Sequence, residues 1–113
     1  MKEIKAIIQP YMLQDVCDAL LQIEDLPGLT VSHVLGFGKT RATEAIETER
    51  LAERSFAKKT KVEIVVQDSA AQKVVDIIAV AARTGKVGDG KIFVCDVEDA
   101  VRIRTGERGA AAV

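Results

Sequence analysis

The chain has 113 residues, 48% of them hydrophobic, so it can bury one core but cannot supply interiors for two domains. Sixteen basic residues nearly balance seventeen acidic ones, and a net charge of −1 argues against nucleic acid or an anionic membrane as the main partner. No apolar run approaches the length of a membrane span and no signal-like segment opens the chain, so we expect a cytoplasmic protein without direct membrane insertion.

The first part of the sequence predicts a βαβ unit. Residues 2–8 have the composition of a strand, and Pro10 suits the first turn of a following helix. Pro27-Gly28 marks a turn, and residues 29–35 alternate well enough for a second strand. Between them, apolar residues recur at helical spacing: Leu13, Val16, Leu20 and Ile23.

A second unit follows over residues 61–97. Residues 61–66 predict a strand, Ser69 and Gln72 have the spacing of a capping box, and residues 91–97 predict the last strand after a loop at 84–90. The helix between them carries one apolar face: Ala71, Val74, Val75, Ile78, Ala81 and Ala82. Two such units in one short domain indicate an α+β, ferredoxin-like double βαβ sandwich, in which an antiparallel sheet carries both helices on one face.

The second face of this sheet is also expected to be covered. Ile7 and Ile8 are adjacent, as are Val65 and Val66, so apolar side chains point to both sides of the sheet. No third helix is predicted to cover the second face. Another copy of the chain is the simplest cover, which predicts a homo-oligomer.

Residues 37–60 form a long insertion between the two units. Loops of this length in compact domains are generally functional or disordered. The segment is rich in charge and in helix formers, with Ile46, Leu51 and Phe56 as its large apolar residues. We expect it to order on a partner protein, the alternative being a solvated linker.

Residues 84–91 form a glycine-rich turn before the last strand. Glycines 85, 88 and 90 let backbone amides approach an anion, and Lys86 and Lys91 add positive charge, so a phosphate group is the expected ligand. The turn is not a P-loop, because Ile92 replaces the magnesium-binding Ser or Thr and the order of helix and strand is inverted. A tight connection is the alternative.

Residues 101–108 place two arginines close together. Val101 and Ile103 are expected on one side of an extended segment, which puts Arg102 and Arg104 together on the other. Two parallel guanidinium groups suit polyphosphate oxygens, whereas the alternative is a charged edge strand.

These segments resemble the motifs of the PII signal-transduction family, also called the nitrogen regulatory protein P-II family. The resemblance rests on Gly36-Phe37-Gly38, on residues 84–93 (TGKVGDGKIF) and on residues 102–107 (RIRTGE), in the order of the family. It implies one PII-like domain over residues 1–113, with a T-loop at 37–60 and a C-terminal arm at 98–113. Such proteins are homotrimers that bind ATP or ADP between subunits, with Mg²⁺ accompanying ATP, and regulate a transporter, enzyme or regulator through the T-loop.

The resemblance also implies roles for individual residues. Thr84, at the start of the glycine-turn motif, would also bind the nucleotide. The phosphates would be held by Gly88, Asp89, Gly90, Lys91, Arg102 and Arg104. Gly28, Thr30, Glu63 and Val65 would border adenine and ribose, while Gly36, Gly38 and Lys39 would form the base of the T-loop.

The inserted segment departs from the family pattern. Lys39 stands where Arg is usual, and Thr40 stands where relatives that sense 2-oxoglutarate generally carry Gln, although the matching Lys59 is kept. The departure at Thr40 weakens the expectation of 2-oxoglutarate binding. Ala52 stands where some relatives carry a uridylylated Tyr, so that modification is not expected.

Two other classes of protein remain as alternatives. One is an acylphosphatase-like enzyme, against which no nucleophile and base pair can be identified in the phosphate-binding segments. The other is a nucleotide-free trimeric adaptor resembling the CutA proteins, which are linked to metal tolerance. No metal site is expected, because His33 is a lone imidazole predicted to pack in a strand, and Cys17 and Cys95 are predicted to be small buried hydrophobes.

Overall fold

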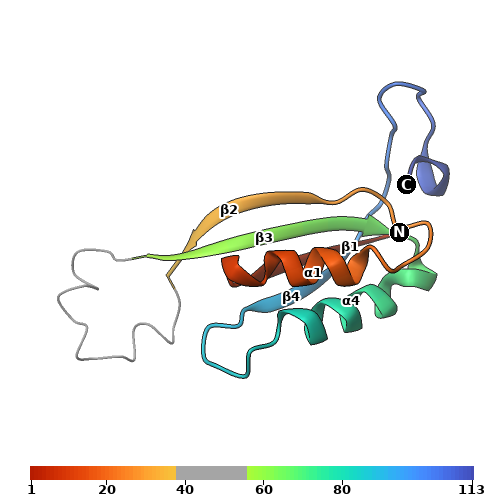
Figure 1. Ribbon diagram of the computed structural model, residues 1–113. Coiled ribbons are helices and arrows are strands. Elements are labelled where there is room, and N and C mark those ends of the chain that lie inside the picture. The colour runs from red at the N-terminus through yellow and green to blue at the C-terminus, as the bar shows by residue number, and fades with distance from the viewer. Residues whose placement is uncertain (38–55) are drawn as a thin grey trace.

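The computed structural model of the protein describes residues 1–37 and 56–113. Four strands form one sheet in the order β2-β3-β1-β4, with every neighbouring pair antiparallel. Both long helices lie on one face of this sheet (Figure 1), which confirms the α+β, ferredoxin-like fold. The elements are β1 (Lys2–Ile8), η1 (Pro10–Met12), α1 (Leu13–Leu20), β2 (Thr30–Gly36), β3 (Ala57–Val66), α4 (Asp68–Ala82), β4 (Lys91–Asp96) and η3 (Gly109–Ala112).

The hydrophobic core lies between the sheet and the two helices. Along β1 and β3 every second side chain points to the helices, as strand geometry requires, and these residues are almost fully buried. The core consists of Ile4, Ala6, Ile8, Val62, Ile64 and Val66 from the strands, with Val16 and Leu20 from α1 and Ala71, Val74, Ile78 and Ala82 from α4. The periodic apolar residues of the sequence therefore mark the faces that pack.

The ends of several elements differ from the prediction. Helix α1 stops at Leu20, and Ile23 packs against the core from the turn that follows. Strand β3 starts at Ala57, so residues 57–60 are strand and not part of the inserted loop. The predicted capping box is wrong: α4 already begins at Asp68, which puts Ser69 inside the first turn, and the Gln72 amide donates to Asp76 instead, at 2.9 Å.

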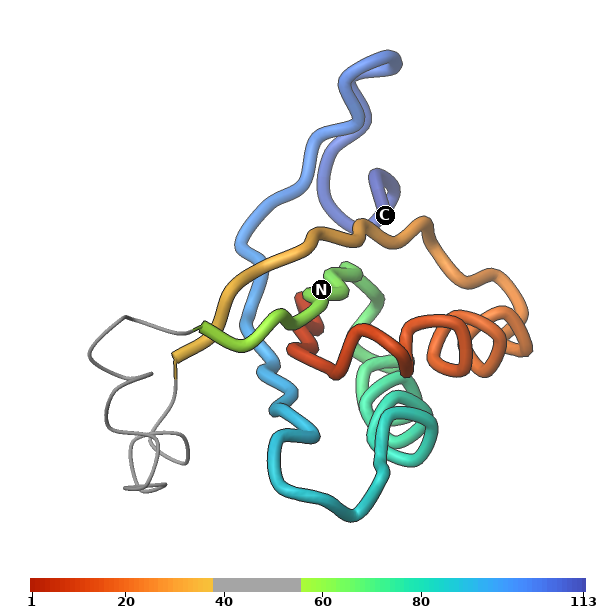
Figure 2. The backbone as a smooth tube through the Cα atoms, turned by 60° about the vertical axis from the view of Figure 1, so that its left-hand side comes forward, coloured from red at the N-terminus to blue at the C-terminus, as the bar shows by residue number. Residues whose placement is uncertain are grey.

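The other face of the sheet carries neither helix (Figure 2). Its side chains are mixed: Ile7 and Val65 are half-buried in the single chain, beside the ion pairs Lys5–Glu3 at 3.9 Å and Lys61–Glu63 at 3.3 Å. Apolar side chains do point both ways, as predicted. On this open face β4 also exposes Cys95, which is therefore not the buried residue expected, while Cys17 is partly buried.

Candidate functional site

The glycine turn connects the end of α4 to β4. Its glycines 85, 88 and 90 have φ angles of +84°, +98° and +100°, a region that side chains with a Cβ rarely adopt. Gly90 also lies directly against β1, since a Cβ there would stand 1.7 Å from the Ile7 carbonyl oxygen. Gly88 is flanked by the side chains of Gln9 and Lys59. Only a glycine fits at position 90, and its backbone is thereby fixed against the sheet.

The carboxylate of Asp89 binds the start of the same turn. Its Oδ2 accepts the backbone amides of Thr84 and Gly85, at 2.8 Å each, and its Oδ1 accepts the Thr84 hydroxyl. These bonds, that of the Thr84 hydroxyl above all, hold the pKa of Asp89 below its usual value, with nearby Arg83 adding to the effect. Asp89 is therefore ionised at neutral pH and closes the turn.

One hollow, which we call the loop hollow, lies between this turn and the root of the inserted segment. It has a volume of about 780 Å³. Inside it the Lys59 ammonium donates to the Gly88 carbonyl at 2.5 Å. Its predicted lining residues are Gly36, Lys59, Gly88, Asp89, Gly90 and Lys91, and those that the sequence did not single out as site residues are Ile7, Gln9, Phe37, Ala57, Lys86, Val87 and Phe93.

Strand pairing explains why part of this lining was missed. Ile7 faces both Lys61 and Lys91 across the sheet, so its place in the hollow follows from the register of three strands. Phe37 packs edge-on against Phe56, with ring centroids 5.7 Å apart, where the inserted segment leaves and rejoins the sheet. No local sequence signal reports either contact. Lys86 alone could have been carried over from the glycine-turn argument.

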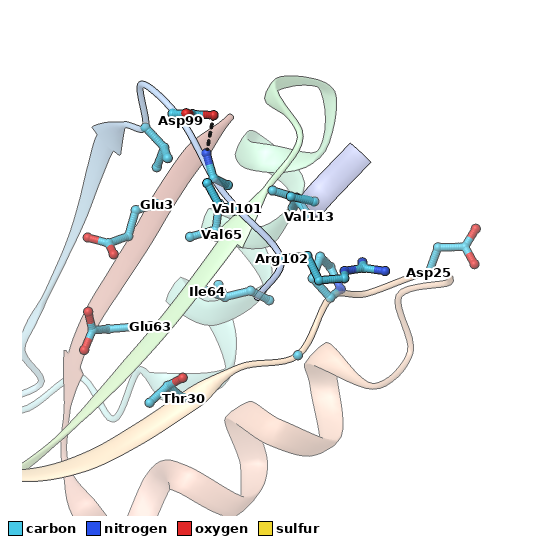
Figure 3. A pocket seen from close by; sticks show the side chains of 15 residues that line it. Glu3, Asp25, Thr30, Glu63, Ile64, Val65, Asp99, Val101, Arg102 and Val113 are labelled. Carbon is cyan, nitrogen blue, oxygen red and sulfur yellow. Dashed lines mark hydrogen bonds between the residues drawn. The ribbon is translucent and has the colours of Figure 1, made fainter. Parts of the chain in front are cut away.

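A second hollow, the arm hollow, has a volume of about 740 Å³ and lies under the C-terminal arm (Figure 3). It brings together the residues predicted to border adenine and ribose with one of the two predicted arginines: Gly28, Thr30, Glu63, Val65 and Arg102. Glu3, Asp25, Val101, Ala112 and Val113 complete much of its wall. Asp25 has a φ of +58°, so the turn before Gly28 holds an uncommon backbone conformation.

The arm is a tight hairpin and not the extended segment that was predicted. Val101 pairs with Arg108, the Arg102 amide donates to the Glu107 carbonyl at 2.9 Å, and the Gly106 amide donates back to the Arg102 carbonyl at 2.7 Å. The alternation argument fails here because residues 103–105 form a turn, closed by Gly106 at a φ of +74°. Arg102 lines the arm hollow and forms an ion pair with Glu107 at 3.5 Å, whereas Arg104 lines neither hollow.

The predicted site residues therefore fall into two groups. The loop hollow and the arm hollow share no lining residue. The insertion root and the arm lie at opposite ends of the sheet in Figure 1. Gly38, Lys39 and Thr40 lie outside the described residues, and Thr84 lines neither hollow. Within one chain, the glycine turn and Arg102 therefore lie in separate hollows.

The described residues offer neither a metal site nor a membrane-spanning helix. Within residues 1–37 and 56–113, no group of three or more His, Cys, Asp or Glu side chains is arranged to hold a metal ion. His33 is exposed on the edge strand β2 and not packed as predicted. Over the same ranges, none of the helices has the length and hydrophobicity needed to traverse a bilayer.

Comparison with known proteins gives full-length matches. A family model described as nitrogen regulatory protein P-II matches residues 1–107. Two similar proteins are the nitrogen regulatory protein P-II of Microchaete diplosiphon, 48% identical, and nitrogen regulatory protein P-II 1 of Escherichia coli K12, 45% identical, each with both chains fully covered. A crystal structure of Arabidopsis thaliana PII bound to citrate superposes with a TM-score of 0.82 at 43% identity, covering 99% of this chain and 91% of that one.

Proposed function

Because the chain belongs to the nitrogen regulatory protein P-II family, we propose that it is a signalling protein whose ligand is ATP or ADP, with Mg²⁺ accompanying ATP. The nucleotide state would decide whether the segment at 38–55 binds a partner protein. A membrane transporter or a regulatory enzyme is the expected partner. The protein would act in the cytoplasm.

The chemistry of the two hollows supports this ligand. Backbone amides of glycines 88 and 90, with Lys86 and Lys91, suit the phosphate tail. On the arm side, Val65 offers an apolar surface for the base, while Thr30 and Glu63 offer polar groups to the base and ribose. Arg102 adds a guanidinium for the phosphates. Neither hollow alone supplies both sets of groups.

The separation of the two hollows is the observation that carries the proposal. A nucleotide can use the glycine turn and Arg102 together only if a second copy brings its arm hollow to the loop hollow of the first. The uncovered face of the sheet, with half-buried Ile7 and Val65, provides the surface on which copies would meet. We therefore propose a homotrimer with a nucleotide site at each junction.

Calorimetry with ATP and with ADP tests the ligand. Lys91→Ala should weaken binding about tenfold or more, because it removes an ammonium from the phosphate side of the site. Lys73→Ala removes an exposed ammonium from α4 and should leave binding unchanged. A flat titration of the unsubstituted protein would exclude a nucleotide sensor and favour a nucleotide-free adaptor. Sustained ATP turnover by the pure protein would instead favour an enzyme.

Mixed assemblies test the junction. Copies with Lys91→Ala and copies with Arg102→Ala should each bind nucleotide poorly when assembled alone. After dissociation and reassembly of a mixture, some junctions join an intact Lys91 from one copy to an intact Arg102 from another, and tight binding should return at those junctions. A mixture that binds no better than either variant would place the site within one chain.

A small carboxylate is a second ligand to examine in the same experiment. The loop hollow presents Lys59 at the root of the insertion, and the similar Arabidopsis thaliana PII structure is described as bound to citrate. Titrating 2-oxoglutarate and citrate in the presence of ATP would show whether either changes nucleotide affinity. An increase with 2-oxoglutarate would show that this effector is bound although Thr40 replaces the Gln of relatives.

A further inference from the structure

The glycine turn packs on the sheet at Gly90, whereas its earlier residues extend into solvent. The loop hollow and a smaller hollow of about 270 Å³, next to the end of α4, both border residues 89–91. Residues 85–88 are exposed to solvent. Burial does not hold the exposed residues 85–88, so the shape of this part of the turn depends on its hydrogen bonds.

Lys59 donates to the Gly88 carbonyl, but the hydrogen bonds at the start of the turn converge on one carboxylate. Asp89 accepts both the amide and the hydroxyl of Thr84 and also the amide of Gly85, while the Thr84 hydroxyl oxygen accepts the Lys86 amide at 3.2 Å. These hydrogen bonds tie the start of the turn to Asp89 near its far end. Asp89 is followed by Gly90, which lies against β1. Thr84 lines neither large hollow, so it is not placed to touch a ligand in them.

We propose that Asp89 and Thr84 are a positioning pair, which holds residues 88–91 in the shape that binds the phosphate tail. Asp89 borders the loop hollow, but both of its carboxylate oxygens already accept hydrogen bonds within the turn, so its part is to shape the turn and not to bind the nucleotide. This inference rests on the proposed function. It assigns to Asp89 and Thr84 a role other than the direct contact that the family resemblance implies. The lowered pKa of Asp89 is consistent with it, because the carboxylate charge is already satisfied within the turn.

The positioning role predicts whether removal of the Asp89 charge strengthens or weakens nucleotide binding. A carboxylate close to a polyphosphate repels it, so deleting Asp89 would tighten nucleotide binding if charge were the only effect. If Asp89 shapes the turn, the same deletion weakens binding, because the phosphate-binding amides lose their alignment. Asp89→Ala should therefore weaken ADP binding about tenfold or more.

Calorimetry with ADP decides between these outcomes when it is done in Mg²⁺ and again in EDTA. The control is Asp76→Ala, which removes an exposed carboxylate of α4 and should leave affinity unchanged. The loss for Asp89→Ala should be the same in both buffers, because the pair binds no ion. Equal or tighter binding would overturn the inference, and so would a loss confined to Mg²⁺, which would make Asp89 a magnesium ligand.

A matched pair of variants at Thr84 isolates the hydroxyl. Thr84→Ser keeps the group that donates to Asp89 and should bind ADP nearly as the unsubstituted protein does. Thr84→Val keeps the size and branching but removes the donor, and should weaken ADP binding in the same direction as Asp89→Ala. Equal affinities for the Ser and Val variants would contradict a role for the hydroxyl.

Amide hydrogen exchange tests the pair in the nucleotide-free protein. The amides of Thr84, Gly85 and Lys86 should exchange slowly in the unsubstituted protein and several-fold faster in Asp89→Ala and Thr84→Val. Unchanged exchange would overturn the positioning role. Failure of the unsubstituted protein to bind any nucleotide would instead overturn the proposed function, and exchange would still decide whether the pair shapes the turn.

Discussion

Thr60 is the one buried polar residue of the core among the described residues, and its hydroxyl has no hydrogen-bond partner there. It faces the helices from β3, opposite Ile8 of β1 and His33 of β2. A buried hydroxyl without a partner costs about 1–3 kcal/mol relative to one that is hydrogen-bonded. Position 60 is therefore a place where the sequence does not optimise stability.

Thr60→Val should raise the free energy of unfolding by about 1 kcal/mol, because a methyl group replaces the unpaired hydroxyl in nearly the same volume. Thr60→Ser keeps the hydroxyl and deletes the methyl group, so it should lower stability. Chemical denaturation of the three proteins measures both effects. A less stable Val variant would show that the hydroxyl is hydrogen-bonded in solution.

Gly90 combines a positive φ with contact against the β1 backbone. Gly90→Ala should lower stability by roughly 3 kcal/mol or more and remove nucleotide binding, since the turn or β1 must move to admit the Cβ. Gly85→Ala is the matched control: its φ is also positive, but nothing lies within 4 Å of the added Cβ. It should cost about 1 kcal/mol. Similar losses for both would mean that φ alone, and not the contact with Ile7, requires glycine at position 90.

At the scale of elements, the interiors of helices and strands were predictable and their ends were not. The apolar faces of α1, α4, β1 and β3 follow from spacing alone, because burial selects every second or every third to fourth residue. The start of β3 was missed because Lys58 and Lys59 look like loop residues, yet their backbones pair with Leu35 and Val34 of β2. Ser69 likewise had the right spacing for a cap but the wrong position in the helix.

The division of the site into two hollows was not predictable from local patterns. Gly36 and Gly90 line the same hollow because of the pairing among β1, β2, β3 and β4, which no motif reports. The arm was mispredicted for a similar reason: the turn that separates Arg102 from Arg104 depends on bonds to Glu107 and Gly106. The glycine turn itself was predictable, because its residue types, glycine above all, favour a turn conformation.

In the C-terminal arm, Glu107 forms an ion pair with Arg102 of the arm hollow and neutralises its charge. Arg102 and Glu107 are both about half exposed, so their ion pair should add little to stability, and Glu107→Gln should change the free energy of unfolding by less than about 0.5 kcal/mol. Nucleotide affinity should rise severalfold, because a negative group beside the phosphates is removed. Calorimetry and denaturation of the same variant separate these effects, and weaker binding would mean that Glu107 orients Arg102.

At the scale of the whole molecule, the proposed trimer depends on the open face of the sheet. Its charges alternate: Lys5 lies opposite Glu63 in the strand register and also pairs with Glu3. Two copies that meet on this face would bury such pairs, and a pair with one charge reversed is costly to bury. The open face is therefore suited to association only while each of its charged groups keeps an oppositely charged partner.

Lys5→Glu should therefore weaken self-association by about tenfold or more, because it gathers three carboxylates on one small area. Light scattering over a dilution series should show three copies of the 12.2 kDa chain for the unsubstituted protein and earlier dissociation for the variant. Lys73→Glu, an equal charge reversal on the exposed side of α4, should not change the mass. An unaffected Lys5→Glu assembly would mean that copies meet elsewhere.

Strand β3 extends beyond the reach of β1. Its register with β1 ends at Thr60, whereas β2 stays paired with it to Gly36 and Ala57, and Phe37 packs on Phe56 just past that point. Gly36 and Ala57 therefore close a two-stranded stem and lie one strand spacing apart, whatever the sequence inserted between them. Lengthening or replacing the inserted segment 38–55 costs only loop-closure entropy, which grows slowly with length. The partner proposed for this segment can therefore change through substitutions in the segment, while the sheet and helices keep their sequence.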